Sequence, residues 1–207
     1  YVRRDIKDIA KIDDVSGYNN LVSLLCFQIG NLVKEQELSL SSGLSRPTVK
    51  KYLFLLENTY VLKLIPPYFT NKRTEITKTP KVYFEDVGLR NGTINNFSPL
   101  NQRSDSGAIL ENFVFSQLSK EDDFSGKIRF WRSQAKNEVD FIWQENINEP
   151  YPIEVKLNYS HRQPLPSGLK SFINLYQPSK GFIIHTGDFN YLELKKTKIY
   201  LIPPWAI

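Results

Sequence analysis

Two acids and a lysine on neighbouring segments of the C-terminal half have the types and spacing to do chemistry. Asp140 lies within the β-prone segment EVDFIW, and Glu154 and Lys156 lie within the next one, YPIEVKL. Side chains of a strand alternate between its faces, so Glu154 and Lys156 are predicted to share the face opposite to the apolar side chains. The same alternation predicts that Val139 and Phe141 share one face and that Asp140 lies on the other. A hairpin at the turn-like ENINEP then brings Asp140 beside Glu154, as two ligands for a hard divalent cation.

A third acid lies on a predicted helix, GAILENFVFSQL, where Glu111 shares a stripe with Phe115 and Leu118 at i, i+4 and i+7. A carboxylate on an apolar stripe is costly unless it is paired, so we expect Glu111 to face the sheet, where a metal or Lys156 compensates its charge. Carboxylates hold Mg²⁺ or Mn²⁺, the metal polarises a phosphodiester and acidifies water, and a lysine stabilises the developing charge. These residue types predict metal-dependent phosphodiester hydrolysis.

Simpler explanations exist for several of these residues. An isolated Glu154 and Lys156 pair would more commonly lie on a solvated strand face as a weak ion pair. Acid clusters also persist for structural reasons, so the site need not be catalytic. His161 and His185 have no partner at ligand spacing and are predicted to be incidental. Trp131 is predicted to pack rather than to stack on nucleic acid.

An α/β pattern surrounds the candidate site. The sequence predicts, in order, a helix at 106–119, strands at 128–133, 138–144 and 151–157, a helix at 166–175, and strands at 180–185 and 197–202. Residues 88–107 are rich in Asn, Ser and Gly and lack sustained periodicity, so we predict an irregular, mobile domain boundary there.

The N-terminal part reads as a helix-turn-helix followed by two strands. Helices are predicted at 19–32, 37–44 and 45–57, the last with Ser45 as its N-cap, and strands that could form a wing are predicted at 60–65 and 81–84. On the third helix Thr48, Lys50 and Lys51, with Arg46 at its start, point away from the core stripe. They favour DNA contact slightly over the alternative, a solvated face of a domain that docks other proteins.

Composition sets broad limits on function. The net charge of +5 is spread along the chain, which permits contact with phosphates without requiring it. The single cysteine, Cys26, lies in an apolar run and fits a core position in a reducing, cytoplasmic setting. No apolar run is long enough for a membrane span and no signal peptide opens the chain. Because it lacks methionine and begins at Tyr1, we expect a fragment of a longer protein.

The ordered set of Glu111, Asp140 and Glu154-Val155-Lys156 resembles the PD-(D/E)xK restriction-endonuclease-like fold. The flanking sequence FWRSQAKNEVDFI…PIEVK resembles one branch of it, the C-terminal region of a family of prokaryotic AAA-type ATPases in which a winged helix precedes the nuclease-like domain. Further segments extend the resemblance over nearly the whole chain: YVRRDI, SRPTVKKYLFLLENTYVL, KVYFEDVGL and GAILENFVF. The proline that names the motif is absent, since Val139 precedes Asp140.

This resemblance implies an α/β fold in which an N-terminal winged helix-turn-helix precedes a restriction-endonuclease-like α/β domain with a central mixed sheet. Its boundaries on this sequence are 1–14 for the remnant of a preceding ATPase lid, 15–87 for the winged helix, 88–104 for a linker and 105–207 for the nuclease-like domain. The ATPase domain and its ATP site would precede Tyr1, and this chain contains no GxxxxGK[ST] phosphate loop.

Carried over residue by residue, the resemblance implies Glu111, Asp140 and Glu154 as metal ligands, with Asp140, Glu154 and Lys156 as catalytic residues. The expected cofactor is Mg²⁺ or Mn²⁺, and the expected partners are DNA, bound without sequence specificity, and the protein's own ATPase domain. An oligomer is left open, and no membrane is involved. The alternative is a catalytically inactive module that binds DNA or protein and targets or regulates the ATPase.

Overall fold

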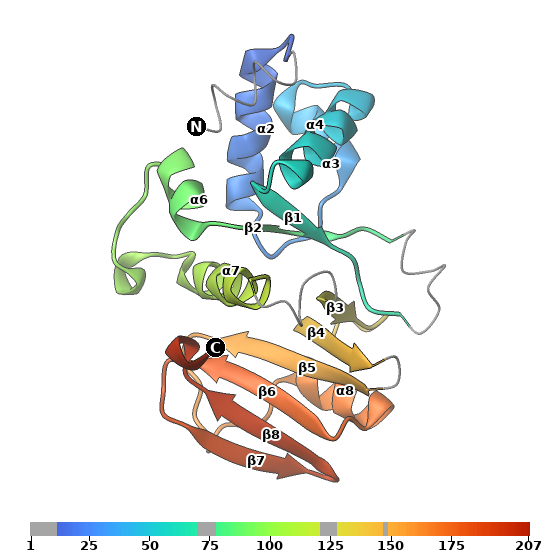
Figure 1. The fold of residues 1–207 in the computed structure, drawn as a ribbon, viewed down its shortest axis with the longest axis vertical. Coiled ribbons are helices and arrows are strands. Elements are labelled where there is room, and N and C mark those ends of the chain that lie inside the picture. The colour runs from blue at the N-terminus through green and yellow to red at the C-terminus, as the bar shows by residue number, and fades with distance from the viewer. Residues whose placement is uncertain (1–11, 70–77, 121–127, 147–148) are drawn as a thin grey trace.

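The computed structural model describes residues 12–69, 78–120, 128–146 and 149–207 (Figure 1). Over these residues the chain is a mixed α/β structure with six α-helices and a six-stranded mixed sheet, so the α/β expectation is confirmed in this coarse form. A helical unit stands at one end and the sheet at the other, with β2 and α7 between them (Figure 1). None of the described helices is long and apolar enough to cross a membrane.

The N-terminal unit contains three helices and a two-stranded antiparallel sheet. The helices are α2 (Val15–Phe27), α3 (Glu35–Ser42) and α4 (Arg46–Asn58), and the strands are β1 (Leu62–Ile65) and β2 (Lys81–Phe84). The predicted N-cap explains the start of α4, because Ser45 accepts from the Thr48 N–H at 3.3 Å. Helix α2 begins earlier than predicted because Asp14 accepts from the Gly17 N–H at 2.8 Å. The α2 helix also ends earlier, and the backbone then turns at Gly30 with φ of +74°.

The β2 strand is buried on both faces, because it lies between two cores. Val82 and Phe84 pack into the core of the helical unit, whereas Tyr83 packs with Phe115 of the next unit. Side chains alternate along the strand, so Lys81 shares the face of Tyr83 and points toward that second unit. The tip between the two strands, residues 70–77, lies outside the described residues.

The stretch at 88–107, where a domain boundary is predicted, contains regular secondary structure. This stretch contains most of helix α6 (Val87–Thr93) and the 3-10 helix η1 (Leu100–Gln102). Arg90 of α6 is buried, donates from Nε to the Cys26 carbonyl at 2.8 Å and forms an ion pair with Asp105 at 2.8 Å. A helix anchored by a buried arginine needs no apolar stripe, so periodicity does not reveal it.

The C-terminal unit consists of α7 (Ser106–Leu118), β3 (Arg129–Arg132), β4 (Glu138–Asn146), β5 (Glu149–Lys156), α8 (Ser167–Tyr176), β6 (Lys180–His185), β7 (Asn190–Leu194) and β8 (Thr197–Ile202). The sheet order is β3-β4-β5-β6-β8-β7. β6 is parallel to both β5 and β8, and the other pairs are antiparallel.

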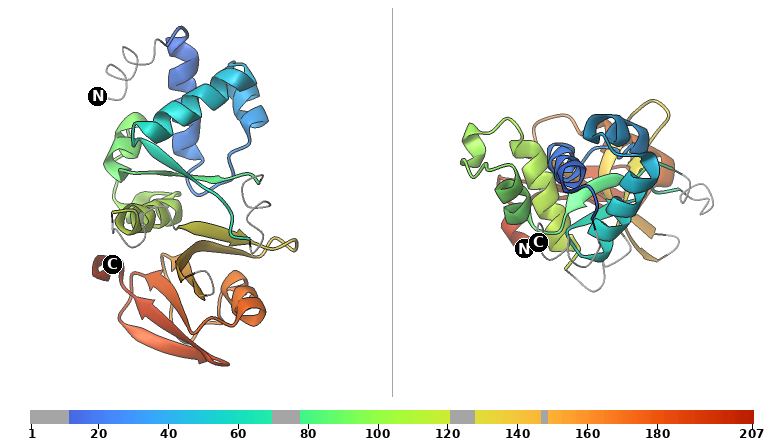
Figure 2. Two further views of the ribbon diagram at one scale, coloured as in Figure 1. Left: turned by 45° about the vertical axis from the view of Figure 1, so that its right-hand side comes forward. Right: turned by 90° about the horizontal axis from the view of Figure 1, so that it is seen from above.

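The two helices of this unit cover opposite faces of the sheet (Figures 1 and 2). The α7 side chains share a core with Ile153 and Val155, and the α8 side chains share another with Ile183. The edge strand β7 was not predicted from the sequence, because its half-exposed NYLEL lacks a clear apolar face.

Candidate active site

Asp140 and Glu154 lie opposite each other on adjacent strands. The antiparallel register that pairs Phe141 with Ile153 places Asp140 of β4 across from Glu154 of β5. Asp140 Oδ2 accepts the Val155 N–H at 2.7 Å, which fixes the carboxylate against β5. Both residues are buried, at 9% and 4% exposure. The structure therefore brings these two predicted site residues together.

A β-bulge in β4 determines how Asp140 is presented. Arg129 pairs with Ile142 and Trp131 with Val139, so β4 contains one extra residue between the two pairs. As a result Val139 packs with Trp131 on the α8 side, whereas Phe141 packs with Tyr83 on the α7 side. The prediction that Val139 and Phe141 share a face is wrong, because strict alternation does not hold across a bulge.

Close packing of α8 supports the same part of β4. A Cβ added at Gly168 would lie 1.6 Å from the Glu138 carbonyl oxygen, so a larger residue at this position would displace the helix. Trp131 is buried and meets Phe172 of α8 edge to face with ring centroids 5.4 Å apart, so its predicted packing role is confirmed.

One carboxylate oxygen of Glu154 has an ion-pair partner, and the other has no partner among the described residues. Its Oε1 forms an ion pair with Lys156 Nζ at 2.7 Å, and Lys156 reaches solvent with a side chain 43% exposed. Its Oε2 is buried and has no hydrogen-bond partner among the described residues. A buried carboxylate oxygen of this kind is costly unless a proton, a cation or a ligand satisfies it.

Glu111 is held by residues that the sequence reasoning missed. The Tyr83 hydroxyl donates to Glu111 Oε1, and Lys81 Nζ lies 3.5 Å from the same oxygen. Lys81 also forms an ion pair with Glu138 Oε1 at 2.5 Å. The direct partners of Glu111 are thus Lys81 and Tyr83 of β2 rather than Lys156.

Asn112, the next residue on α7, joins this helix to β2. Its Oδ1 accepts the Phe84 N–H and its Nδ2 donates to the Phe84 carbonyl, both at 2.8 Å, and its side chain is fully buried. The amide thus bonds the β2 backbone as a neighbouring strand would. This contact places Glu111 beside Lys81 and Tyr83.

Burial and mutual repulsion disfavour the ionised acids. Burial, together with the Asp140 charge, raises the pKa of Glu111 to about 7 and the pKa of Glu154 to about 8. Burial also raises the pKa of Asp140, although the Lys81 charge opposes it. Conversely, burial lowers the pKa of Lys81 but Glu111 and Asp140 raise it, with a net rise above the ordinary value. The site therefore combines four carboxylates, those of Glu111, Glu138, Asp140 and Glu154, with the positive charges of Lys81, Arg132 and Lys156.

Mg²⁺ and Mn²⁺ prefer carboxylate oxygens as ligands, so the acidic side chains of this site are of a type suited to a hard divalent cation. Asp140 and Glu154 could supply two such oxygens, including the free Oε2 of Glu154. Within the described ranges, however, no three His, Cys, Asp or Glu side chains are arranged to hold a metal ion. Glu111, Asp140 and Glu154 are neighbours here without forming a three-carboxylate cage.

The two histidines differ in their surroundings. His185 of β6 pairs in register with Lys156, accepts the Gly187 N–H at 3.1 Å and is buried, and its Nε2 has no partner among the described residues. His161 is exposed, near Asn190. The free Nε2 of His185 was not foreseeable from ligand spacing.

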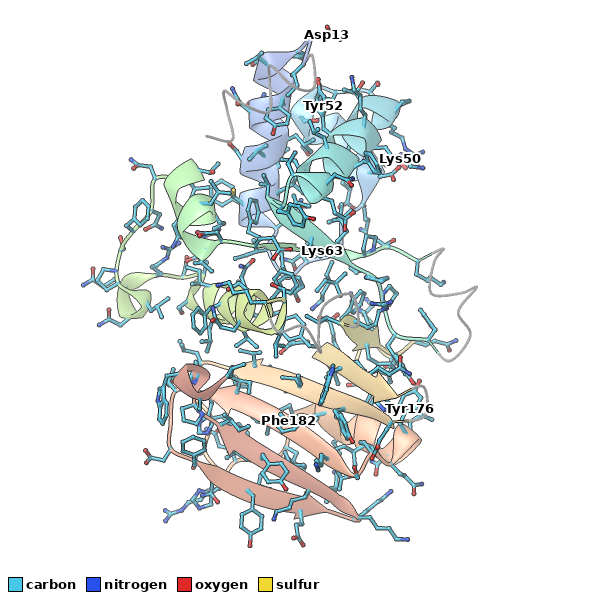
Figure 3. The ribbon with its side chains drawn as sticks, viewed as in Figure 1. Asp13, Lys50, Tyr52, Lys63, Tyr176 and Phe182 are labelled. Atoms are coloured by element: carbon cyan, nitrogen blue, oxygen red, sulfur yellow. The ribbon has the colours of Figure 1, made fainter. Side chains whose placement is uncertain are left out.

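The residues predicted to contact DNA lie on the surface of the helical unit. Lys50 and Lys51 are exposed, and Figure 3 shows Lys50 pointing outward from α4. Arg46 lies 3.7 Å from Glu35, and the Thr48 hydroxyl shares a hydrogen bond with Ser45 at 2.8 Å. The structure thus leaves Arg46, Lys50 and Lys51 exposed, whereas Thr48 is partly buried.

Comparison with known proteins yields two family matches and a few relatives. Residues 1–100 match a domain of unknown function, DUF8612, and residues 106–205 match a second one, DUF4143. Uncharacterized proteins of Mycobacterium tuberculosis and Mycobacterium bovis are each 26% identical over 196 residues, which are 92% of this chain and 43% of theirs. The chain thus spans less than half the length of these curated relatives.

One solved structure also resembles the chain, at a level too low to support an inference. It is the half-complex of a tetradecameric assembly of Thermococcus gammatolerans McrB AAA+ hexamers with bound McrC. The match has 10% identity and a TM-score of 0.37, and covers 90% of this chain and 71% of that one.

The two family matches divide the residues of the acid site between them. Glu111, Asp140 and Glu154 lie in the part that matches DUF4143, and Lys81 and Tyr83 lie in the part that matches DUF8612.

Proposed function

We propose that this chain is a DNA-associated, nuclease-like module of an AAA-type ATPase, whose Asp140 and Glu154 hold a divalent cation for phosphodiester hydrolysis. The observation that carries the proposal is the buried Glu154 carboxylate, which has a free Oε2 beside Asp140 and pairs through Oε1 with the solvent-reaching Lys156. Burial of an incompletely paired acid is costly, and a bound cation would offset that cost.

The fold supports this proposal in its finer details. In the helical unit, α4 follows α3 across a tight turn at Gly43 and precedes the β1-β2 sheet, as in a winged helix-turn-helix. In the second unit, Glu111 comes from a helix, Asp140 from the middle of three antiparallel strands and Glu154 and Lys156 from the third. That order matches the PD-(D/E)xK pattern, with Val139 in place of the proline.

Each side chain has a defined part in the proposed hydrolysis. A bound Mg²⁺ or Mn²⁺ would polarise the phosphate and acidify a water. Asp140 and Glu154 would hold that ion, and the backbone N–H of Val155 orients Asp140. Lys156, half-exposed at the end of β5, contacts the phosphate and stabilises the charge that develops on it.

The proposed partner is an ATPase domain of the same protein. The part of the relatives that this chain matches is 43% of their length, which leaves room for such a domain in them. DNA is the proposed second partner, through Lys50 and Lys51, with Arg46 and Thr48 in lesser roles because other side chains of the helical unit already engage them.

A second candidate function is an inactive module that binds protein and targets or regulates the ATPase. Two observations favour it. Glu111 is engaged by Lys81 and Tyr83, so a third carboxylate is not offered to a metal. In addition, the Phe54 ring of α4, one turn after Lys50, is 69% exposed and would be available to a partner protein.

Mn²⁺ titration by calorimetry separates the two functions. We expect the chain to bind Mn²⁺, and Asp140→Asn or Glu154→Gln to weaken binding at least about 100-fold, because each removes an anionic ligand. Glu193→Gln, which changes an exposed acid on β7, is the matched control and should bind as the parent does. Plasmid cleavage in Mn²⁺, absent in chelator and in Lys156→Ala, would establish the enzyme. Equal Mn²⁺ binding by the parent and both site variants would refute the proposed metal site.

A further inference from the structure

The Lys81 ammonium is enclosed within the acid site. Its side chain is 3% exposed and contacts Glu138 Oε1 at 2.5 Å and Glu111 Oε1 at 3.5 Å. It also lies over the ring of Phe130, 5.4 Å from the centroid. A buried ammonium is stable only when anions surround it, and Lys81 has two carboxylates in contact and the charge of Asp140 nearby.

The other lysine of the site is placed differently. Among the described residues the ion-pair partner of Lys156 is Glu154, and the Lys156 side chain is 43% exposed, so solvent and ligands reach it. Lys81 has no such access. One lysine is therefore positioned to meet a phosphate, and the other to neutralise the acids from within.

We infer that Lys81 is the resident cation of the acid site: it holds Glu111 and Glu138, so that one divalent ion binds at Asp140 and Glu154 and no second ion binds. This inference rests on the proposed metal-dependent function and narrows it. A divalent ion at Glu111 and Glu138 would have to displace an ammonium that cannot reach solvent. The Tyr83 hydroxyl, which donates to Glu111, reinforces that arrangement.

The source of this cation matters because β2 belongs to the helical unit. Lys81 and Tyr83 share one face of β2, while Val82 and Phe84 anchor the other face in the helical core. The charge balance of the nuclease-like unit thus depends on a strand from the unit before it. We expect the site to be complete only when the two units are docked.

The test is Mn²⁺ binding by Lys81→Met, which keeps the length of the side chain and removes its charge. We expect this variant to bind Mn²⁺ about tenfold or more tightly, or to take up a second ion. Glu111 then loses its ammonium partner, and Glu138 keeps only the surface contact with Arg132 at 3.6 Å. The double variant Lys81→Met with Glu138→Gln should return toward the parent. Lys63→Met, which removes an exposed lysine paired with Glu57 at 3.5 Å on β1, is the matched control and should behave as the parent does.

Unchanged affinity and stoichiometry in a folded Lys81→Met would overturn the inference, as would equal binding by the single and double variants. If Lys81→Met is unfolded in chelator, recovery of the parent's circular dichroism on addition of Mn²⁺ supports the inference. Failure to recover, with Lys81→Arg folded, overturns it. If the parent binds no Mn²⁺ while Lys81→Met does, the proposed metal site at Asp140 and Glu154 fails. The role of Lys81 in keeping a divalent ion away from Glu111 and Glu138 is then still supported. If Asp140→Asn abolishes Mn²⁺ binding but Lys81→Met changes nothing, the proposed metal site stands and the inference about Lys81 fails.

Discussion

The acid site and the exposed face of α4 both carry charged side chains, but they hold them in different ways. Lys81, Asp140 and Glu154 are buried, and Lys81 of the helical unit contacts the partly buried Glu111 and Glu138 of the nuclease-like unit. The α4 lysines, Lys50 and Lys51, lie in solvent, and their neighbour Arg46 has a surface contact with Glu35 at 3.7 Å. A buried charge has to be compensated by specific partners, whereas an exposed charge needs none.

This difference affects what each region indicates about function. An exposed basic face costs little to keep, so Lys50 and Lys51 are weak evidence for DNA binding. In the acid site the buried Oε2 of Glu154 has no partner among the described residues, and burial raises the pKa of both Glu111 and Glu154, so this region is stronger evidence for a ligand. Mutations in the two regions should therefore differ in the size and kind of their effects.

The largest effect is expected where α7 joins β2 behind the acid site. Asn112→Ala leaves the buried N–H and carbonyl of Phe84 unpaired, and each such group costs about 1–3 kcal/mol. We expect the free energy of unfolding in urea to fall by about 2–5 kcal/mol. On α4, Asn58→Ala removes an exposed hydrogen bond to the Phe54 carbonyl and should change stability by less than about 0.5 kcal/mol. Similar losses of unfolding free energy in Asn112→Ala and Asn58→Ala would contradict the proposed difference between the buried site and the exposed helix.

The acid site should also show its own pH dependence in the absence of metal. The pKa of Glu154 is raised to about 8, so its stabilising protonated form is fully present below the ordinary value near pH 4.5 and is lost as pH rises through about 8. Glu154→Gln removes this loss. We expect the variant to gain stability relative to the parent between pH 5 and pH 9, on the order of 1 kcal/mol or more, by urea unfolding in chelator. A constant difference across that range would count against the burial cost argued for Glu154.

Much of the fold and part of the site could be predicted from local patterns. The apolar runs predicted the strands at 81–84, 180–185 and 197–202 at their observed bounds. Period-two alternation in YPIEVKL, with a hairpin, predicted that Asp140 would lie beside Glu154, because that relation involves two adjacent strands.

Relations between distant segments could not be predicted in this way. Lys81 and Tyr83 were assigned to the helical unit, and nothing in the KVYF pattern shows which acids their face meets. The bulge that separates Val139 from Phe141 leaves the apolar pattern unchanged. The alternation of Lys81 and Tyr83 with Val82 and Phe84 was nevertheless a signal that β2 has two different faces.

A smaller effect is expected at the buried arginines between the two regions. Hydrogen bonds from Arg103 and Arg90 hold the pKa of Asp105 at about 2. The stability that Asp105 gains from its two arginine partners is present above the ordinary pKa near 4 and is lost as pH falls toward about 2. Asp105→Asn should therefore destabilise the protein by about 1–2 kcal/mol at pH 7 and by less near pH 2. Glu35→Gln, which breaks the surface contact with Arg46, serves as the α4 counterpart and should show no pH-dependent loss.

The smallest effect on stability is expected on α4 itself. Lys50→Ala with Lys51→Ala should leave the free energy of unfolding within about 0.5 kcal/mol of the parent, because both side chains are solvated. Their proposed role is in binding, where each lysine that neutralises a phosphate adds about 0.9 to the slope of log affinity against log salt. We therefore expect the double variant to weaken binding to unrelated duplexes alike and to lower that slope by up to about 1.8.

Sequence readout by this helix should be poor, since Arg46 contacts Glu35 and the Thr48 hydroxyl bonds Ser45, which leaves few groups for base edges. Fluorescence anisotropy on two duplexes of different sequence, over a range of salt concentrations, measures both quantities. Phe54→Ala separates the alternatives, because a phosphate contact does not need this exposed ring and a protein interface does. If the lysine variant binds DNA as the parent does while Phe54→Ala loses association with the proposed ATPase domain, then α4 is a docking surface. In that case the acid site would have to recruit DNA without its help.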